Sequence, residues 1–189
     1  MPPRPRSAPR PRAPTTSAPA RAAPPARTRP TRDAVGLVFV AAFAPAVDEK
    51  LVDINARFPE VALASATRTL TYPSGRAEPG TEAFIDHEAF HRVFCADLPA
   101  EQARVMAVTQ RPVSLDAFTS VVTGAAAWTT LPSWAIVATA DQAIHPDAER
   151  EMARRASSQI VEIDASHAVA VSQPVAVADV TLRAVKATS

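Results

Sequence analysis

The sequence is poor in residues that form cross-links and tight turns. Cys95 is the only cysteine in 189 residues, which excludes an intrachain disulfide, and we expect it to be a buried structural thiol. Only four glycines occur, and no serine stands between two of them in a GxSxG pattern, so the sharp serine turn of that motif is absent from the sequence. No run approaches the roughly 18 consecutive apolar residues of a membrane-spanning helix, and we expect no membrane partner.

Acidic residues are missing from residues 1–32, which hold 10 prolines and 8 arginines. Because this segment has no large apolar side chain after Met1, it cannot bury enough surface to offset the entropy of ordering, and we expect a disordered tail with polyproline character. The dense prolines exclude the amphipathic helix of an organelle transit peptide, and a secretory signal would need roughly 7 to 15 consecutive apolar residues. We therefore expect a cytoplasmic protein.

Two explanations of this tail stay open. It could be a basic arm that contacts an anionic partner. Alternatively, because Pro, Arg and Ala share GC-rich codons, a frameshift or a misassigned start in a GC-rich gene would produce the same composition. In the remainder of the chain 12 basic residues stand against 19 acidic ones, a net charge of −7, so we expect no nucleic-acid partner for the folded part.

The stretch 133–174 predicts a βαβ unit, in which a helix joins two parallel strands. Its apolar runs 134–140 and 159–163 have the length of buried strands. Between them lies a helix-like segment with acidic residues near its start and arginines near its end, an order that suits the helix dipole. Because the loops after parallel strands leave a sheet at the same edge, Asp141 and His167 should face one crevice.

The residues alone also allow plainer interpretations of this pair. Asp141 could be an ordinary loop or helix-start residue, and His167 a loop histidine held by the backbone. Asp164 and Glu162 compete with Asp141 as partners of His167, although both belong to the end of the second strand and would point back along the chain. We expect His145 at the start of the connecting helix.

From about Asp33 onward, the chain resembles the C-terminal half of the α/β-hydrolase superfamily. The nearest branch is that of the small bacterial esterases, whose relatives include plant methyl esterases and hydroxynitrile lyases. The resemblance rests on VGLVFVAAFAP (35–45), LPSWAIVATADQAIHP (131–146) and IDASHAVAVSQP (163–174).

This resemblance implies an α/β fold in which residues 33–189 form the C-terminal portion of a parallel sheet, with a helical cap inserted at about 46–130. It implies that Asp141 orients His167 and that His167 is the general base. It also implies a nucleophilic serine some tens of residues before the run 35–43, at the place that the tail occupies.

We therefore expect a member of a serine ester hydrolase family that acts on small esters or amides, in a chain that lacks the nucleophile and the oxyanion loop and is inactive as written. The alternative is a non-catalytic pseudoenzyme or binding remnant. The resemblance implies no cofactor and no metal. The choice between hydrolysis and lyase chemistry and the oligomeric state stay open.

Within residues 46–130, spacing predicts helices over 48–57, 84–94 and 100–109, and the Pro and Gly residues of 69–80 predict a loop. Aromatic side chains of this segment could line an apolar pocket, although such residues more often form a core. These are Phe84, Phe90, Phe94, Phe118 and Trp128.

Two further elements flank this segment. The run 35–43 predicts a strand covered on both faces, which would become an exposed apolar edge without the neighbouring strand that the family places beside it. At the other end of the chain, Ser172 is expected to cap a final helix. The expected buried side of that helix consists of Val175, Val177, Val180, Leu182 and Val185.

One motif predicts a different chemistry. The segment 87–91 reads HEAFH and matches HExxH, in which two histidines on one helix face bind zinc and the glutamate acts as base. A catalytic zinc needs a third protein ligand, and the extended motif fails at Phe94. A distant Glu101 could complete the set. We expect His87 and His91 to be surface residues of the cap, and a zinc hydrolase is the third hypothesis.

Overall fold

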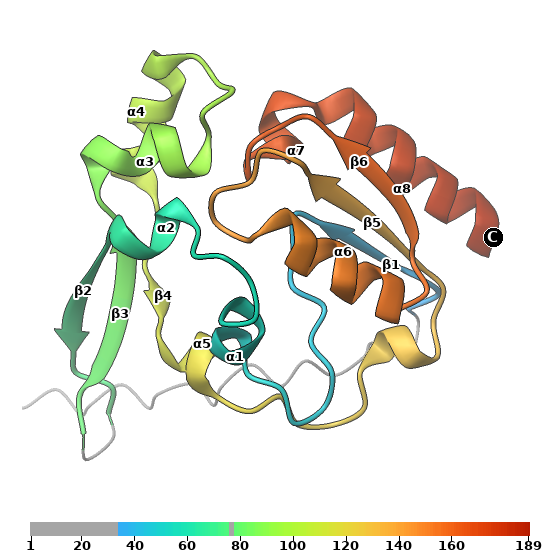
Figure 1. The fold of residues 1–189 in the computed structure, drawn as a ribbon, viewed down its shortest axis with the longest axis horizontal. Coiled ribbons are helices and arrows are strands. Elements are labelled where there is room, and N and C mark those ends of the chain that lie inside the picture. The colour runs from blue at the N-terminus through green and yellow to red at the C-terminus, as the bar shows by residue number, and fades with distance from the viewer. Residues whose placement is uncertain (1–33, 76–77) are drawn as a thin grey trace, which may run out of the picture.

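A three-stranded parallel sheet forms the centre of the protein. The computed structural model describes residues 34–75 and 78–189, and its parallel strands lie in the order β1 (Leu37–Val40), β5 (Ser133–Ala138) and β6 (Gln159–Ile163) (Figure 1). Every residue of the central strand β5 is buried, as expected for an apolar run with a neighbour on both sides. The predicted α/β class is confirmed, whereas the predicted tail, residues 1–32, lies outside the described residues.

Helices cover both faces of this sheet. Alternate residues of β5 point to opposite faces, so that Trp134 and Ile136 pack with Val180 of helix α8 (Pro174–Thr188). On the other face helix α6 (Pro146–Arg155) places Met152 beside Phe39 of β1. The result is a three-layer arrangement of helix, sheet and helix.

Helix α6 joins β5 to β6, and the predicted βαβ unit is confirmed. His145 precedes the helix and its Nδ1 accepts a hydrogen bond from the Asp147 amide at 3.2 Å, so it stands at the helix start as expected. Pro146 occupies the first turn, where its missing N–H costs nothing. Ser157, with a φ of 52°, lies just after the helix and turns the chain back toward β6.

The segment between β1 and β5 contains a second sheet, which is antiparallel with the order β2-β3-β4. The predicted loop over 69–80 is wrong at its two ends: residues 69–72 belong to β2 and Gly80 begins β3, because the alternating Thr, Leu and Tyr residues form a strand and the Pro and Gly residues form only the turn that follows it. The strands are β2 (Thr67–Tyr72), β3 (Gly80–Ile85) and β4 (Val113–Ser114).

Short helices accompany this sheet. The helix predicted over 100–109 has those bounds. The helix predicted over 84–94 begins only at His87, because the residues up to Ile85 pair in β3. Asp86 caps this helix by accepting a hydrogen bond from the Glu88 amide. The helix predicted over 48–57 is confined to five residues. The helices are α1 (Leu51–Asn55), α2 (Ala62–Ser65), α3 (His87–Phe94), α4 (Ala100–Thr109), α5 (Asp116–Thr119) and the 3-10 turn η1 (Ala127–Thr129).

The end of the chain differs from the prediction. Ser172 does not cap the final helix: it is the last residue of the short helix α7 (Val169–Ser172), and Gln173 precedes α8 without a side-chain cap. Val175, Leu182 and Val185 were expected to be buried, but they are 73%, 54% and 54% exposed. A sheet of three strands contacts a single stripe of α8, and these three residues lie on the opposite side of the helix.

Strand β1 lies at an edge of the sheet. All four of its residues are only half-buried, so the expected burial on both faces is not found. Among residues 34–75 and 78–189, β5 is its only strand partner. An apolar edge of this kind exposes unpaired backbone groups. The described part of the chain contains no helix with the length and apolarity needed to cross a bilayer.

Candidate active site

The loops that follow β5 and β6 are joined by backbone hydrogen bonds. The Thr139 amide donates to the Ile163 carbonyl at 2.9 Å, and the Ala140 amide donates to the Ala165 carbonyl at 3.1 Å. These bonds extend the parallel pairing beyond the strands and bring Asp141 next to His167. Asp141 Oδ2 and His167 Nδ1 lie 2.6 Å apart.

The Asp141 side chain is fully buried, and hydrogen bonds hold it in place. Its Oδ1 accepts from the amides of Ala143 at 2.6 Å and Ile144 at 3.0 Å, while Oδ2 faces His167. Two backbone N–H groups therefore hold Oδ1 in place, and Oδ2 faces the imidazole ring. When Nδ1 carries a proton, it donates to Oδ2, and this hydrogen bond fixes the orientation of the ring.

His167 keeps its second nitrogen free for chemistry. Its side chain is 21% exposed, and within the described residues no group hydrogen-bonds Nε2. When Nδ1 carries the proton and donates to Asp141, Nε2 has a lone pair that can accept a proton from a nucleophile. The pair is thus suited to general acid–base catalysis.

The end of helix α3 packs against His167. The Phe94 ring lies 4.8 Å from the imidazole, centroid to centroid, and the Phe94 carbonyl accepts a hydrogen bond from the Ala168 amide at 3.0 Å. Of the aromatic residues proposed as pocket lining, Phe94 is therefore the one that borders His167. Phe90 is buried in the cluster that holds Cys95, and Trp128 packs elsewhere, against Arg155.

Asp97 holds the loop that carries His167. Its Oδ1 accepts a short hydrogen bond from the Ser166 hydroxyl, and its Oδ2 accepts from the Ser166 amide at 3.2 Å. Burial alone would raise the pKa of Asp97, but hydrogen bonds, chiefly those from Ser166, outweigh it and lower the pKa. Asp97 follows α3, so the segment before β5 positions the residue next to His167. No local pattern predicts this contact, because Asp97 and Ser166 are 69 positions apart.

Glu149 lies in the protein interior beside this pair. Its carboxyl group is buried, Oε2 accepts from the Ala138 amide at 3.2 Å, and Oε1 has no hydrogen-bond partner among the described residues. Burial, together with the neighbouring Asp141 carboxylate, raises the pKa of Glu149 well above its usual range. From the charge order alone, Glu149 is one of the acidic residues expected near the start of the helix. A signal was present, since Glu149 shares a helix face with Ala148, Met152 and Ala153.

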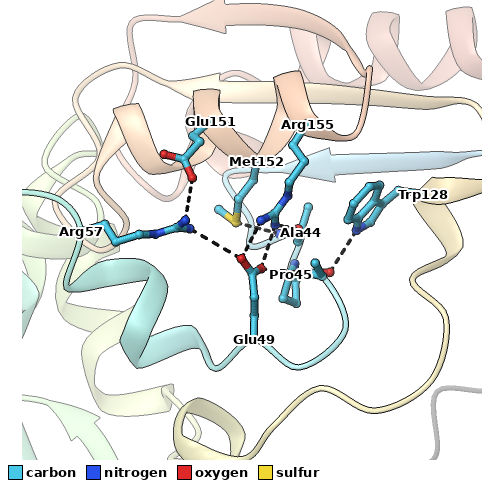
Figure 2. A network of polar contacts seen from close by, with 9 residues as sticks. Ala44, Pro45, Glu49, Arg57, Trp128, Glu151, Met152 and Arg155 are labelled. Atoms are coloured by element: carbon cyan, nitrogen blue, oxygen red, sulfur yellow. Dashed lines mark hydrogen bonds and ion pairs between the residues drawn. The ribbon is translucent and has the colours of Figure 1, made fainter.

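A polar network ties the segment after β1 to helix α6. Figure 2 shows Arg155 of α6 pointing toward Glu49, with hydrogen bonds of 2.6 and 2.9 Å, and donating to the Ala44 carbonyl at 2.9 Å. The guanidinium also lies 5.5 Å from the Trp128 ring, whose Nε1 donates to the Pro45 carbonyl. The hydrogen bond from Arg155 lowers the pKa of Glu49.

The structure assigns the competing residues to other contacts. Both carboxylate oxygens of Glu162 accept from Arg150 at 2.8 Å, and Asp164 is exposed, so Asp141 alone pairs with His167 among the described residues. The Cys95 thiol is buried as expected, and burial followed by the nearby Asp97 raises its pKa.

The HExxH histidines lie on α3 outside this site. His87 is exposed, and His91 Nε2 lies 2.9 Å from the Leu98 carbonyl, an ordinary structural contact. In the described ranges, no three His, Cys, Asp or Glu side chains come together as a metal site. The third ligand that the zinc hypothesis needs is not supplied by these residues.

Sequence and structure comparisons place these observations among known proteins. The profile of a family described as the alpha/beta hydrolase family matches residues 7–180. No curated protein sequence matches the chain.

Solved structures with a similar fold include three enzymes. Polyneuridine aldehyde esterase has 16% sequence identity and a TM-score of 0.66, covering 79% of this chain and 61% of its own. The methylesterase MES16 from Arabidopsis has 17% sequence identity and a TM-score of 0.60, and the match covers 80% of this chain and 59% of MES16. A pyrethroid hydrolase from Sphingobium faniae JZ-2 has 19% sequence identity and a TM-score of 0.57, and the match covers 79% of this chain and 60% of the hydrolase. The chain therefore spans about 60% of the length of these structures. At these identities the likeness concerns the fold.

Proposed function

We propose, from the premise that this chain belongs to the alpha/beta hydrolase family, that it carries the acid–base part of an ester hydrolase. His167 is the general base and Asp141 the carboxylate that orients it. The observation that carries the proposal is the 2.6 Å contact between Asp141 Oδ2 and His167 Nδ1 at the carboxyl edge of the parallel sheet. The names of an esterase and a methylesterase among the similar structures support small esters as the substrate class.

In this mechanism His167 Nε2 takes the proton of a nucleophilic hydroxyl as its oxygen attacks the ester carbonyl. The resulting imidazolium is stabilised by the Asp141 carboxylate, which keeps its three N–H donors throughout. His167 then returns the proton to the leaving alkoxide, which departs as the alcohol. A water molecule releases the acyl group in a second cycle of the same proton transfers.

The nucleophile is the missing partner in this scheme. No serine of the 189 residues stands in a GxSxG turn, so we propose that this chain alone does not hydrolyse esters. Among the described residues β1 has a strand partner on one side only, which supports a nucleophile strand on its other side. We assign residues 46–130 as the cap, which the packing of Phe94 on His167 supports.

A non-catalytic remnant is the second candidate, and the absence of a serine turn favours it. The cytoplasmic location and the lack of nucleic-acid and membrane partners remain predictions, which fractionation and binding assays would check.

The deciding experiment is peptide mass spectrometry of the protein from its native source, searched against all three forward reading frames of the gene and its upstream DNA. We expect peptides from a strand and a GxSxG turn joined to the region 35–45, and we expect that native protein to lose ester hydrolysis when His167 is replaced by Ala. Tail peptides such as SAPRPR would instead refute the hydrolase and support the remnant.

A further inference from the structure

Glu149 is the only buried acidic residue besides Asp141 within residues 34–75 and 78–189, and the two carboxyl groups are neighbours. It belongs to helix α6, which begins five residues after Asp141 and buries Glu149 on its inner face. Asp141 receives three N–H donors, two at Oδ1 and one at Oδ2. Glu149 receives one, from the Ala138 amide, and its buried Oε1 has no hydrogen-bond partner in the part of the chain that the structure describes.

Among the described residues, Arg150 is the cation that acts on Glu149, and it is engaged elsewhere. The sheet side presents apolar residues around a narrow cavity, among them Phe39, Ala135 and Val137. Arg150, the next residue on the helix, is occupied by Asp147 and Glu162 at the surface. A buried carboxylate beside another carboxylate is strongly disfavoured, so one of the two groups must hold a proton.

The donor count decides which group holds the proton. A carboxylate has about four lone-pair positions, and three of those on Asp141 face N–H groups, which stabilises the ion. Glu149 has a single N–H donor and an apolar setting, which stabilise its neutral form. An O–H on Glu149 would fill the remaining position on Asp141 and give the orphaned oxygen a role.

We propose that Glu149 is a positioning residue that keeps its proton at neutral pH and donates a hydrogen bond to Asp141, holding that carboxylate ionised and aimed at His167. The direction of the Glu149 pKa shift agrees with this protonation state. The catalytic meaning of the contact rests on the proposed function, but the location of the proton does not.

NMR spectroscopy of the full 189-residue chain tests the proposal. The ¹³C resonance of the Glu149 carboxyl group, assigned by its loss in Glu149→Gln, should stay at the position of a protonated acid from pH 5 to pH 8. The Nδ1–H proton of His167, assigned by its loss in His167→Gln, should be observed in the wild type and retained in Glu149→Gln, whose amide N–H can replace the donor. In Glu149→Leu, which has no donor, that resonance should shift or exchange away.

Glu151→Gln is the matched control, because Glu151 lies on the same helix at the surface, paired with Arg57, and its loss should leave the His167 signal unchanged. A Glu149 carboxyl group that ionises below about pH 6 would overturn the proposal. So would an unchanged Nδ1–H signal in Glu149→Leu, which would make Glu149 a packing residue only. If the Leu variant does not fold, the wild-type carboxyl resonance still decides the protonation state. A native protein that contains the GxSxG turn and still hydrolyses no ester would refute the proposed function and leave these resonances as expected.

Discussion

The replacement Asp141→Asn should reverse the proton positions on His167. Because Oδ1 of Asp141 accepts from the amides of Ala143 and Ile144, the single oxygen of Asn must take that position to keep both bonds. The NH₂ group then faces His167 Nδ1, which must become the acceptor. The proton moves to Nε2, and the nitrogen that should act as base loses its lone pair.

The expected cost in catalysis follows from this change of tautomer. In an active native protein the rate should fall by about 10⁴-fold, as it does when the orienting aspartate of a serine protease is replaced in the same way. That loss corresponds to about 5.5 kcal/mol of transition-state stabilisation. The assay is kcat for a short-chain nitrophenyl ester, with Asp164→Asn as the control, since Asp164 is exposed beside the same loop.

The tautomer itself can be read without turnover. ¹⁵N NMR of the 189-residue chain should show Nδ1–H in the wild type and Nε2–H in Asp141→Asn. If the variant retains Nδ1–H, or if the native variant hydrolyses esters within about tenfold of the wild-type rate, the assignment of Asp141 as the orienting carboxylate is refuted.

Three further predictions concern stability and are measured by urea denaturation. Arg155→Met should lower the free energy of unfolding by about 2–4 kcal/mol, because Glu49 loses a bidentate partner in a partly buried network. The control Arg154→Met, on the exposed side of the same helix, should change it by under about 0.5 kcal/mol. Equal losses in the two variants would show that the network does not stabilise the fold. The folded-state pKa of Glu149 is raised above its ordinary 4.5, so the stability that the neutral group contributes is complete below pH 4.5 and is lost as pH rises. The free energy of unfolding of Glu149→Gln should therefore increase relative to that of the wild type by up to about 1.4 kcal/mol per pH unit between roughly pH 5 and 8. A difference that does not change with pH would refute a raised pKa. Asp97→Ala should cost about 1 kcal/mol and speed hydrogen exchange of the Ser166 amide, and unchanged exchange would show that Asp97 does not hold that loop.

The βαβ unit could be predicted because its signals are local. Two apolar runs of strand length and a helix with ordered charges fix the topology, and parallel strands then require Asp141 and His167 at one edge. The role of Asp97 could not be predicted in this way, because Asp97 and Ser166 are 69 positions apart. Their contact depends on how the end of α3 packs against the loop after β6. Burial decides the role of Glu149, and helix-dipole reasoning predicts only that an acid suits the first turn.

The remaining errors have the same physical origin. The Pro and Gly residues of 69–80 mark a turn correctly, but the pairing of β2 with β3 around that turn is a long-range property. The apolar residues of α8 were all assigned to a core, although a sheet of three strands has room for one stripe of the helix. In both cases the structure depends on contacts with strands that local patterns do not predict.

The short sequence distance between Asp141 and His167 has a consequence for the order of folding. These residues are 26 positions apart, whereas the contacts of Arg155 with Glu49 and of Met152 with Ala44 join residues 106 and 108 positions apart. Closing a long loop costs more entropy before any contact forms. We therefore expect β5, α6 and β6 to assemble in the transition state, and the polar network around Arg155 to form afterward. Substitutions at Ile136 should therefore slow folding, while those at Arg155 should mainly speed unfolding. The chain would thus bring Asp141 and His167 together before residues 46–130 are in place.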